Sequence, residues 1–166
     1  EKSKDKANLM LKNGLYSRFG MSDSLRFEKA LIGCIGEFAF EDYLNKNSID
    51  YKLDITDFTK SNTDLFDYEV NNYKLDIKVA KKTTKSSPND NWTYGYPKEQ
   101  KPETKDYVII GLVDFKNKNV NFYGWITGKD ITNFEVVTKN SFAGYNYLTP
   151  NHEFEWGDLN KNFEKL

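Results

Sequence analysis

The sequence is short of sulfur and imidazole ligands: its 166 residues include one cysteine, Cys34, and one histidine, His152. A single cysteine excludes a disulfide framework within the chain. One cysteine and one histidine together are too few ligands for a zinc site. We interpret His152 as a loop residue without a catalytic role. The absence of disulfides is typical of a reducing compartment, so we expect a cytoplasmic protein, encoded by a bacterium or a phage.

Long apolar runs and an excess charge are also missing. The longest strongly apolar stretch, Tyr107 to Val113, falls well short of the roughly 20 residues that cross a bilayer, which predicts no membrane contact. The 24 basic and 25 acidic side chains give a net charge of −1, so a site for a polyanion must be a local patch. The phosphate-loop motif G-x-x-x-x-G-K-[ST] and the nucleophile motif G-x-S-x-G are absent, which argues against ATP-driven work and serine hydrolysis.

The length and the 38% share of apolar residues fit one compact domain. Residues 1–21 are polar and contain two glycines, so we expect a weakly ordered N-terminal arm or a short, loosely attached helix there. Residues 22–166 are expected to form a single α/β domain with a mixed central sheet flanked by helices. The elements expected along it are a helix over Leu25 to Asn45, strands over 51–55, 65–70 and 73–80, a long loop over 81–105, and a hairpin of strands 107–115 and 120–127.

Two acids meet in the first predicted hairpin. A two-residue turn at Asn71-Asn72 sets Asp67 opposite Asp76. Carboxylates whose Cβ atoms lie about 5 Å apart repel each other unless a proton or a cation lies between them. Two carboxylate oxygens suit Mg²⁺, and Lys78 lies two residues further along the same face. The simpler interpretation is that these charges form the water-facing side of an ordinary hairpin.

The predicted helix carries a third acid. Glu37 lies among apolar residues on one helical stripe, where an ionised carboxylate must be paired or bind metal. Gly33 and Gly36 would let this helix approach the sheet closely. The helix and the hairpin are therefore expected to share one site.

These residues carry a resemblance to a known family. The order Gly33-x-x-Gly36-Glu37-x-x-Phe40-x-x-Tyr43-Leu44, then Asp67, then Asp76-Ile77-Lys78 at the end of a hairpin, resembles the PD-(D/E)XK nuclease superfamily over about residues 24 to 115. The resemblance implies a restriction-endonuclease-like core of a helix, three strands, a further helical element and another strand. It also implies one or two Mg²⁺ ions, for which Mn²⁺ would substitute.

Carried over by position, the resemblance makes Glu37 the helical acid, Asp67 the motif aspartate, Asp76 the (D/E) acid and Lys78 the motif lysine. The backbone carbonyl of Ile77 would be a further metal ligand. No proline precedes Asp67, and Asp64 or Glu69 could take the aspartate role instead.

Substrate contacts are expected after the hairpin, where lysines and aromatic residues alternate with prolines. Lysines there would grip phosphates without regard to sequence, and aromatic rings would stack on bases. The candidates for this interface are Lys81, Lys82, Lys85, Trp92, Lys98, Lys101 and Lys105, with Tyr94, Tyr96, Asn89 and Asn91 for base contacts.

The function predicted from these residues is Mg²⁺-dependent hydrolysis of phosphodiester bonds, with double-stranded or branched DNA as the substrate and an endonuclease as the favoured type. A homodimer would be needed to cut both strands at one place, because one site cleaves one bond at a time. The alternatives are a non-catalytic module of the same fold that binds nucleic acid or protein, and a resolvase or nickase for branched DNA.

Overall fold

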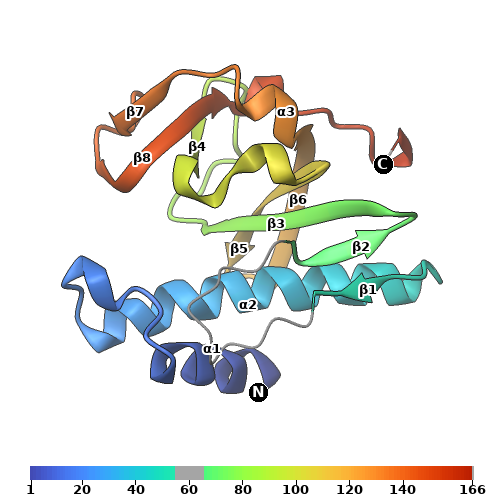
Figure 1. Cartoon of the computed structure of the whole chain (residues 1–166), viewed down its shortest axis with the longest axis horizontal. Helices are drawn as coiled ribbons and strands as arrows, with labels where there is room; N and C mark the ends of the chain where they lie inside the picture. The colour runs from blue at the N-terminus through green and yellow to red at the C-terminus, as the bar shows by residue number, and fades with distance from the viewer. Residues whose placement is uncertain (55–65, 166) are drawn as a thin grey trace.

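The computed structural model describes residues 1–54 and 66–165 and has three layers (Figure 1). Helix α2 (Asp23–Lys46) lies against a mixed sheet in the order β1-β2-β3-β5-β6, and α1 (Lys2–Lys12) packs on α2. A second, antiparallel sheet in the order β4-β8-β7 lies on the opposite side of the first. The strands are β1 (Lys52–Leu53), β2 (Tyr68–Val70), β3 (Tyr73–Lys81), β4 (Thr93–Pro97), β5 (Tyr107–Asp114), β6 (Asn119–Thr127), β7 (Val136–Lys139) and β8 (Asn146–Glu155).

Helix α2 confirms the long predicted helix. Ser22 caps its start, since its Oγ accepts a hydrogen bond from the Leu25 amide at 3.3 Å. The helix covers one face of the larger sheet, where the apolar side chains of both elements form a common core. This core consists of Phe40, Leu44, Tyr68, Val70, Leu75, Ile77 and Ile109.

The hairpin of β2 and β3 has the predicted turn. Asn71 and Asn72 adopt left-handed backbone angles, with φ of 51° and 66°, as a tight two-residue turn requires. The ladder ends where Tyr68 pairs with Leu75. Asp67 therefore lies just outside the ladder, which corrects the predicted direct pair with Asp76.

Strand β5 is an interior strand, as its apolar sequence predicts. It runs parallel to β3 and antiparallel to β6. Its side chains alternate between the core beneath α2 and a second core between the two sheets. The second core is formed by Tyr96, Val108, Ile110, Leu112, Ile126, Ile131, Phe154, Trp156 and Leu159.

The predicted long loop over 81–105 is wrong in its second half. Residues 93–97 form β4, which pairs with β8 so that Tyr96 lies opposite His152. His152 is therefore a buried strand residue, with Nδ1 3.1 Å from the carbonyl oxygen of Phe134, and not a loop residue. The prolines of this segment favour a loop. The strand that pairs with it lies far away in the sequence, so no local pattern reveals the pairing. The remaining short elements are η1 (Ser17–Phe19), η2 (Lys98–Gln100), η3 (Pro102–Thr104), α3 (Gly128–Ile131), η4 (Trp156–Asp158) and η5 (Phe163–Lys165).

The start of the chain also differs from the expected loose arm. Helix α1 packs along α2, and Ala7 is fully buried between them. Cys34 of α2 lies in the same contact, with its Sγ 3.7 Å from Sδ of Met10. Burial raises the pKa of the Cys34 thiol to about 11. Within residues 1–54 and 66–165 no helix has both the length and the apolar character of a membrane span.

Candidate active site

Strand β3 places Asp76 and Lys78 toward the second sheet. Leu75 and Ile77 belong to the core beneath α2, so the alternation of the strand turns their neighbours to the other face. There the hydroxyl of Tyr96, from β4, donates a hydrogen bond to Asp76. Asp76 is only 4% exposed, so it does not belong to the water-facing side of an ordinary hairpin.

The two carboxylate oxygens of Asp76 have separate partners. Lys78 Nζ donates to Oδ1 at 2.7 Å, and the Tyr96 hydroxyl donates to Oδ2 at 2.5 Å. Burial by itself would raise the pKa of Asp76, but the Lys78 ammonium and the Tyr96 hydroxyl hold this pKa below its ordinary value. Burial opposes the charge of Lys78 as well, yet Asp76 raises the pKa of Lys78 well above its usual range. The pair is therefore ionised at neutral pH.

Asp67 is half-buried and lies immediately before β2. Its Oδ2 accepts a hydrogen bond from the Ile77 amide at 2.6 Å. Burial, followed by the negative charges of Asp76 and Glu37, raises the pKa of Asp67 well above its ordinary value. Its Oδ1 has no hydrogen-bond donor in the part of the chain that the structure describes. A carboxyl group in this setting favours a bound proton or a bound cation.

Glu37 lies on α2 at a point where the helix lies close to β3. A Cβ atom on Gly36 would come within 2.4 Å of Val79, whereas a Cβ on Gly33 would touch nothing within 4 Å. We expected both glycines to let α2 approach the sheet closely, but only Gly36 has this role. The Tyr68 hydroxyl donates to the backbone carbonyl of Glu37 at 2.9 Å, which fixes this turn of the helix over the end of β2.

Within the predicted set, Lys78 pairs with Asp76, and the charges of Asp76, Glu37 and Lys78 all act on Asp67. Of the alternative acids, Glu69 is paired elsewhere. Glu69 forms an ion pair with Lys52 at 2.8 Å, and Asp64 lies outside the described residues. Asp67 is therefore the candidate for the third acid beside Asp76 and Glu37.

Two members of the site were missed by the sequence analysis. Lys6 of α1 forms an ion pair with Glu37, and Tyr96 binds Asp76 although we expected it to contact bases. Neither role has a local sequence signal, because each partner lies on a distant element.

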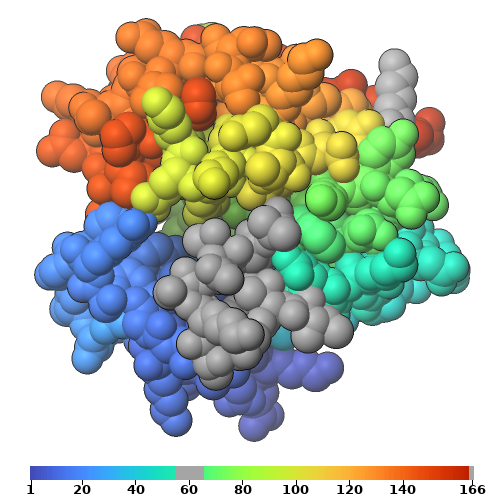
Figure 2. Space-filling view, in the orientation of Figure 1, coloured from blue at the N-terminus to red at the C-terminus, as the bar shows by residue number. Residues whose placement is uncertain are grey.

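On the face in Figure 2, the N-terminal segment (blue) and the segment of η2 and η3 (yellow) lie on either side of a hollow, and an ion pair between Arg18 and Glu99 joins them.

The predicted substrate lysines divide into paired and exposed groups. Lys81 forms an ion pair with Glu28 at 2.5 Å, and Lys82 with Asp114 at 3.4 Å. Their ammonium groups are thus already neutralised by acids, which weakens the case for phosphate contact. Lys81 is nevertheless exposed, and the predicted lysines that are exposed and form no ion pair within the described residues are Lys85, Lys98 and Lys101.

Trp92 and Lys105 are built into the fold. Trp92 packs edge-to-face against Trp156, with ring centroids 6.4 Å apart, at the border of the core between the sheets. Lys105 is 8% exposed, and its Nζ donates to the Gln100 carbonyl at 2.7 Å. Burial lowers the pKa of Lys105, while the negative charge of Asp76 opposes that shift. Trp92 and Lys105 therefore contact other parts of the fold, and these contacts differ from the base and phosphate contacts that we expected.

The number and spacing of the acidic side chains decide whether a metal ion fits this site. Within the described ranges, no group of three or more Asp, Glu, His or Cys side chains is spaced to hold a metal by itself. Mg²⁺ commonly takes only one or two carboxylates and keeps several waters. Asp67 and Asp76 supply that number, and the free oxygen of Asp67 among like charges suits a hard cation. Asp67 with its free oxygen therefore suits Mg²⁺, whereas both oxygens of Asp76 accept hydrogen bonds here, so the predicted set of Asp67, Asp76, the Ile77 carbonyl and Glu37 stays a prediction.

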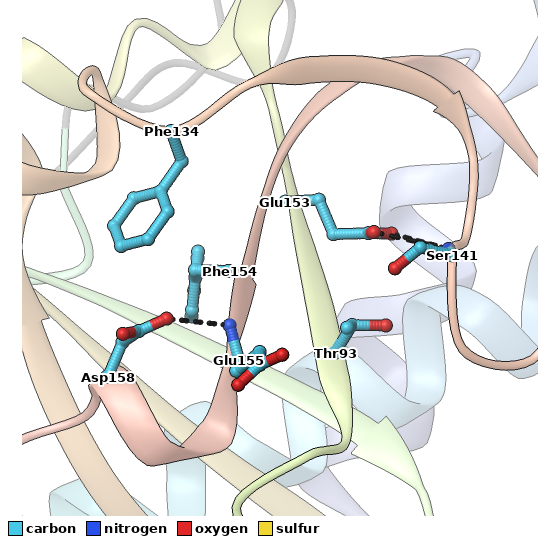
Figure 3. A pocket seen from close by; sticks show the side chains of 7 residues that line it. All are labelled: Thr93, Phe134, Ser141, Glu153, Phe154, Glu155 and Asp158. Carbon is cyan, nitrogen blue, oxygen red and sulfur yellow. Dashed lines mark hydrogen bonds between the residues drawn. The ribbon is translucent and has the colours of Figure 1, made fainter.

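A second hollow lies on the smaller sheet and has a volume of about 340 Å³ (Figure 3). Acidic side chains line it, but internal donors bind them: the Ser141 amide and the Tyr147 hydroxyl donate to Glu153, and the Glu155 amide donates to Asp158. These acids therefore stabilise the turns around β8. The hollow offers no unpaired group comparable to Asp67.

Comparison with known protein families, with curated proteins and with solved structures finds no match to this chain. Any functional conclusion therefore rests on the arrangement of its own residues.

The Tyr96 hydroxyl gives a first test of this arrangement. A Tyr96→Phe variant keeps the buried ring and removes the donor to Asp76, so the metal-dependent DNA cleavage that the sequence predicts should fall about 10-fold or more, as it does when a group that orients a metal ligand is lost. The measurement is the cleavage rate over a titration of Mg²⁺.

Tyr123→Phe is the matched control. The Tyr123 ring packs against Trp156 at 5.3 Å, and its hydroxyl has no hydrogen bond within the described residues. Equal rates for the two variants would contradict a role of Tyr96 in orienting Asp76.

Proposed function

We propose that this chain is a metal-dependent nuclease of the PD-(D/E)XK type, with DNA as its substrate and internal phosphodiester bonds as its target. The observation that supports this most is the partly buried cluster in which Lys78 pairs with Asp76, while the charges of Asp76 and Glu37 both act on Asp67. Ordinary strand pairs rarely bury an aspartate beside a second, half-buried one, because the desolvation of each charge is costly.

The fold is compatible with this type. A helix, a hairpin that carries the acids and a strand parallel to β3 occur in the order that the resemblance implies. The implied second helix is replaced by β4 and two short 3-10 helices. The restriction-endonuclease-like core is therefore proposed for residues 23–114, with the smaller sheet as an addition to it.

The side chains have separate roles in the proposed reaction. Mg²⁺ held by Asp67, Asp76 and the Ile77 carbonyl would neutralise charge on the phosphate and acidify a bound water. Lys78 keeps its proton because Asp76 raises its pKa, so it acts as a cation and not as a general base. Its ammonium stabilises negative charge that develops on the phosphate oxygens. The Tyr96 hydroxyl holds the Asp76 carboxylate in place. Burial of Asp76 keeps water from the side of the Asp76–Lys78 pair that faces the interior.

The test of this proposal is an assay of the purified chain on supercoiled plasmid, a four-way DNA junction and single-stranded RNA, each with Mg²⁺, Mn²⁺ or EDTA. We expect cleavage of DNA with either metal and none with EDTA. Conversion of plasmid to the nicked form first and the linear form later would indicate one strand cut at a time.

The rivals predict different results in the same assay. A resolvase would cut the junction and spare the plasmid, whereas a non-catalytic module would bind DNA without cutting it under any condition. If the enzyme makes double-strand breaks, the active species must contain two copies, which sedimentation in the presence of DNA would detect. Absence of metal-dependent cleavage on all three substrates would refute the nuclease.

A further inference from the structure

Helix α1 brings a second ammonium group to the acidic cluster. Lys6 Nζ forms an ion pair with Oε2 of Glu37, and both side chains are partly buried, at 28% and 18% exposure. The ammonium also lies 5.8 Å from the centroid of the Phe38 ring, which favours its position over α2.

The two ammonium groups divide the acids between them. Lys78 pairs with Asp76, and Lys6 pairs with Glu37. Burial would lower the pKa of Lys6, but the charge of Glu37 raises it, and Asp67 acts in the same direction. Lys6 is therefore a charged member of the cluster that also contains Asp67.

The attachment of α1 does not require this ion pair. Ala7, Met10 and Leu11 of α1 pack on apolar side chains of α2, and this contact buries Ala7 completely. Lys4, on the same helix, is exposed. Of Lys4 and Lys6, only Lys6 therefore places its charge next to Glu37.

We propose that Lys6 is an internal counter-ion of the candidate metal site, which holds Glu37 when no metal is bound and competes with a divalent cation for the negative field of the acids. This inference rests on the proposed function. The ammonium and an arriving metal carry charges of the same sign within a partly buried cluster, so each weakens the binding of the other. Lys6 thereby sets how much divalent cation the site requires.

The experiment measures Mn²⁺ binding to the full chain without DNA, by the electron paramagnetic resonance signal of free Mn²⁺ at fixed ionic strength. We expect Lys6→Met to bind Mn²⁺ about ten-fold more tightly than the unaltered chain, because the competing charge is gone. Lys4→Met is the matched control and should leave the affinity unchanged. Lys6→Gln, with a polar end, is the second variant should the methionine variant unfold.

A double-mutant cycle locates the effect. In a Glu37→Gln background the removal of Lys6 should raise the affinity by a smaller factor, since Glu37 no longer holds the ammonium at the cluster. An equal gain in that background, an unchanged affinity in Lys6→Met and Lys6→Gln, or weaker binding in either would each overturn the inference.

The same measurement separates this inference from the proposed nuclease. If the unaltered chain binds Mn²⁺ and cuts DNA while the Lys6 variants bind Mn²⁺ with the same affinity, the counter-ion role alone is wrong. If the unaltered chain neither binds Mn²⁺ nor cuts DNA, the nuclease is wrong and the counter-ion role with it.

Discussion

Asp76→Asn is expected to abolish DNA cleavage, with a loss of about 100-fold or more. The substitution keeps the shape of the side chain but removes the charge that pairs with Lys78 at 2.7 Å and, in the proposed function, binds the metal. Lys78→Met should cause a loss of the same order, because the cation that stabilises the phosphate is gone. The measurement is single-turnover cleavage of plasmid at saturating Mg²⁺.

The controls must separate chemistry from folding. Each variant leaves one partner of a buried pair alone, so the free energy of unfolding should fall by about 1–3 kcal/mol, and assays should be run well below the melting temperature. Asp114→Asn is the matched control, since Asp114 is another buried strand aspartate in an ion pair, with Lys82. Cleavage by folded Asp76→Asn at the rate of Asp114→Asn would refute the site.

Gly36→Ala is expected to destabilise the protein by about 1–3 kcal/mol, since overpacking forces neighbouring atoms apart. The new Cβ would lie 2.4 Å from Cγ2 of Val79 and 2.7 Å from its Cγ1. Relief of this overlap requires α2 to move away from β3, which would also carry Glu37 away from Asp67. Urea unfolding and the cleavage rate should therefore both respond.

Gly33→Ala offers a matched control three residues away on the same helix. A Cβ there meets no atom within 4 Å, so the higher helix propensity of alanine should stabilise the protein by up to about 1 kcal/mol. The two alanine variants are thus predicted to shift stability in opposite directions. A Gly36→Ala variant as stable as Gly33→Ala would contradict the close approach of helix and sheet.

The parts of the fold that sequence could predict are those with local causes. The capping residue Ser22 marks the start of α2, and two asparagines that tolerate left-handed angles mark the turn between β2 and β3. Once that turn was placed, the alternation of β3 put Asp76 and Lys78 on one face. The order of the motif residues points to Glu37 and Asp67.

The parts that sequence could not predict depend on distant partners. Strand β4 contains a proline and two tyrosines in a segment that looks like a loop, and it becomes a strand only because β8 pairs with it. Tyr96 therefore was assigned to base contacts although it is fully buried against Asp76. Lys6 was overlooked for the same reason, because its partner Glu37 lies on another helix.

The single thiol of the chain provides a reporter of helix separation. Cys34 lies buried where α1 packs on α2, and burial raises its pKa to about 11, so alkylating reagents, which attack the thiolate, react slowly while the helices stay together. Because no other cysteine is present, the rate of modification follows the detachment of α1 without any engineered label. A rate that changes with added Mn²⁺ would show directly whether metal binding loosens the helix that carries Lys6.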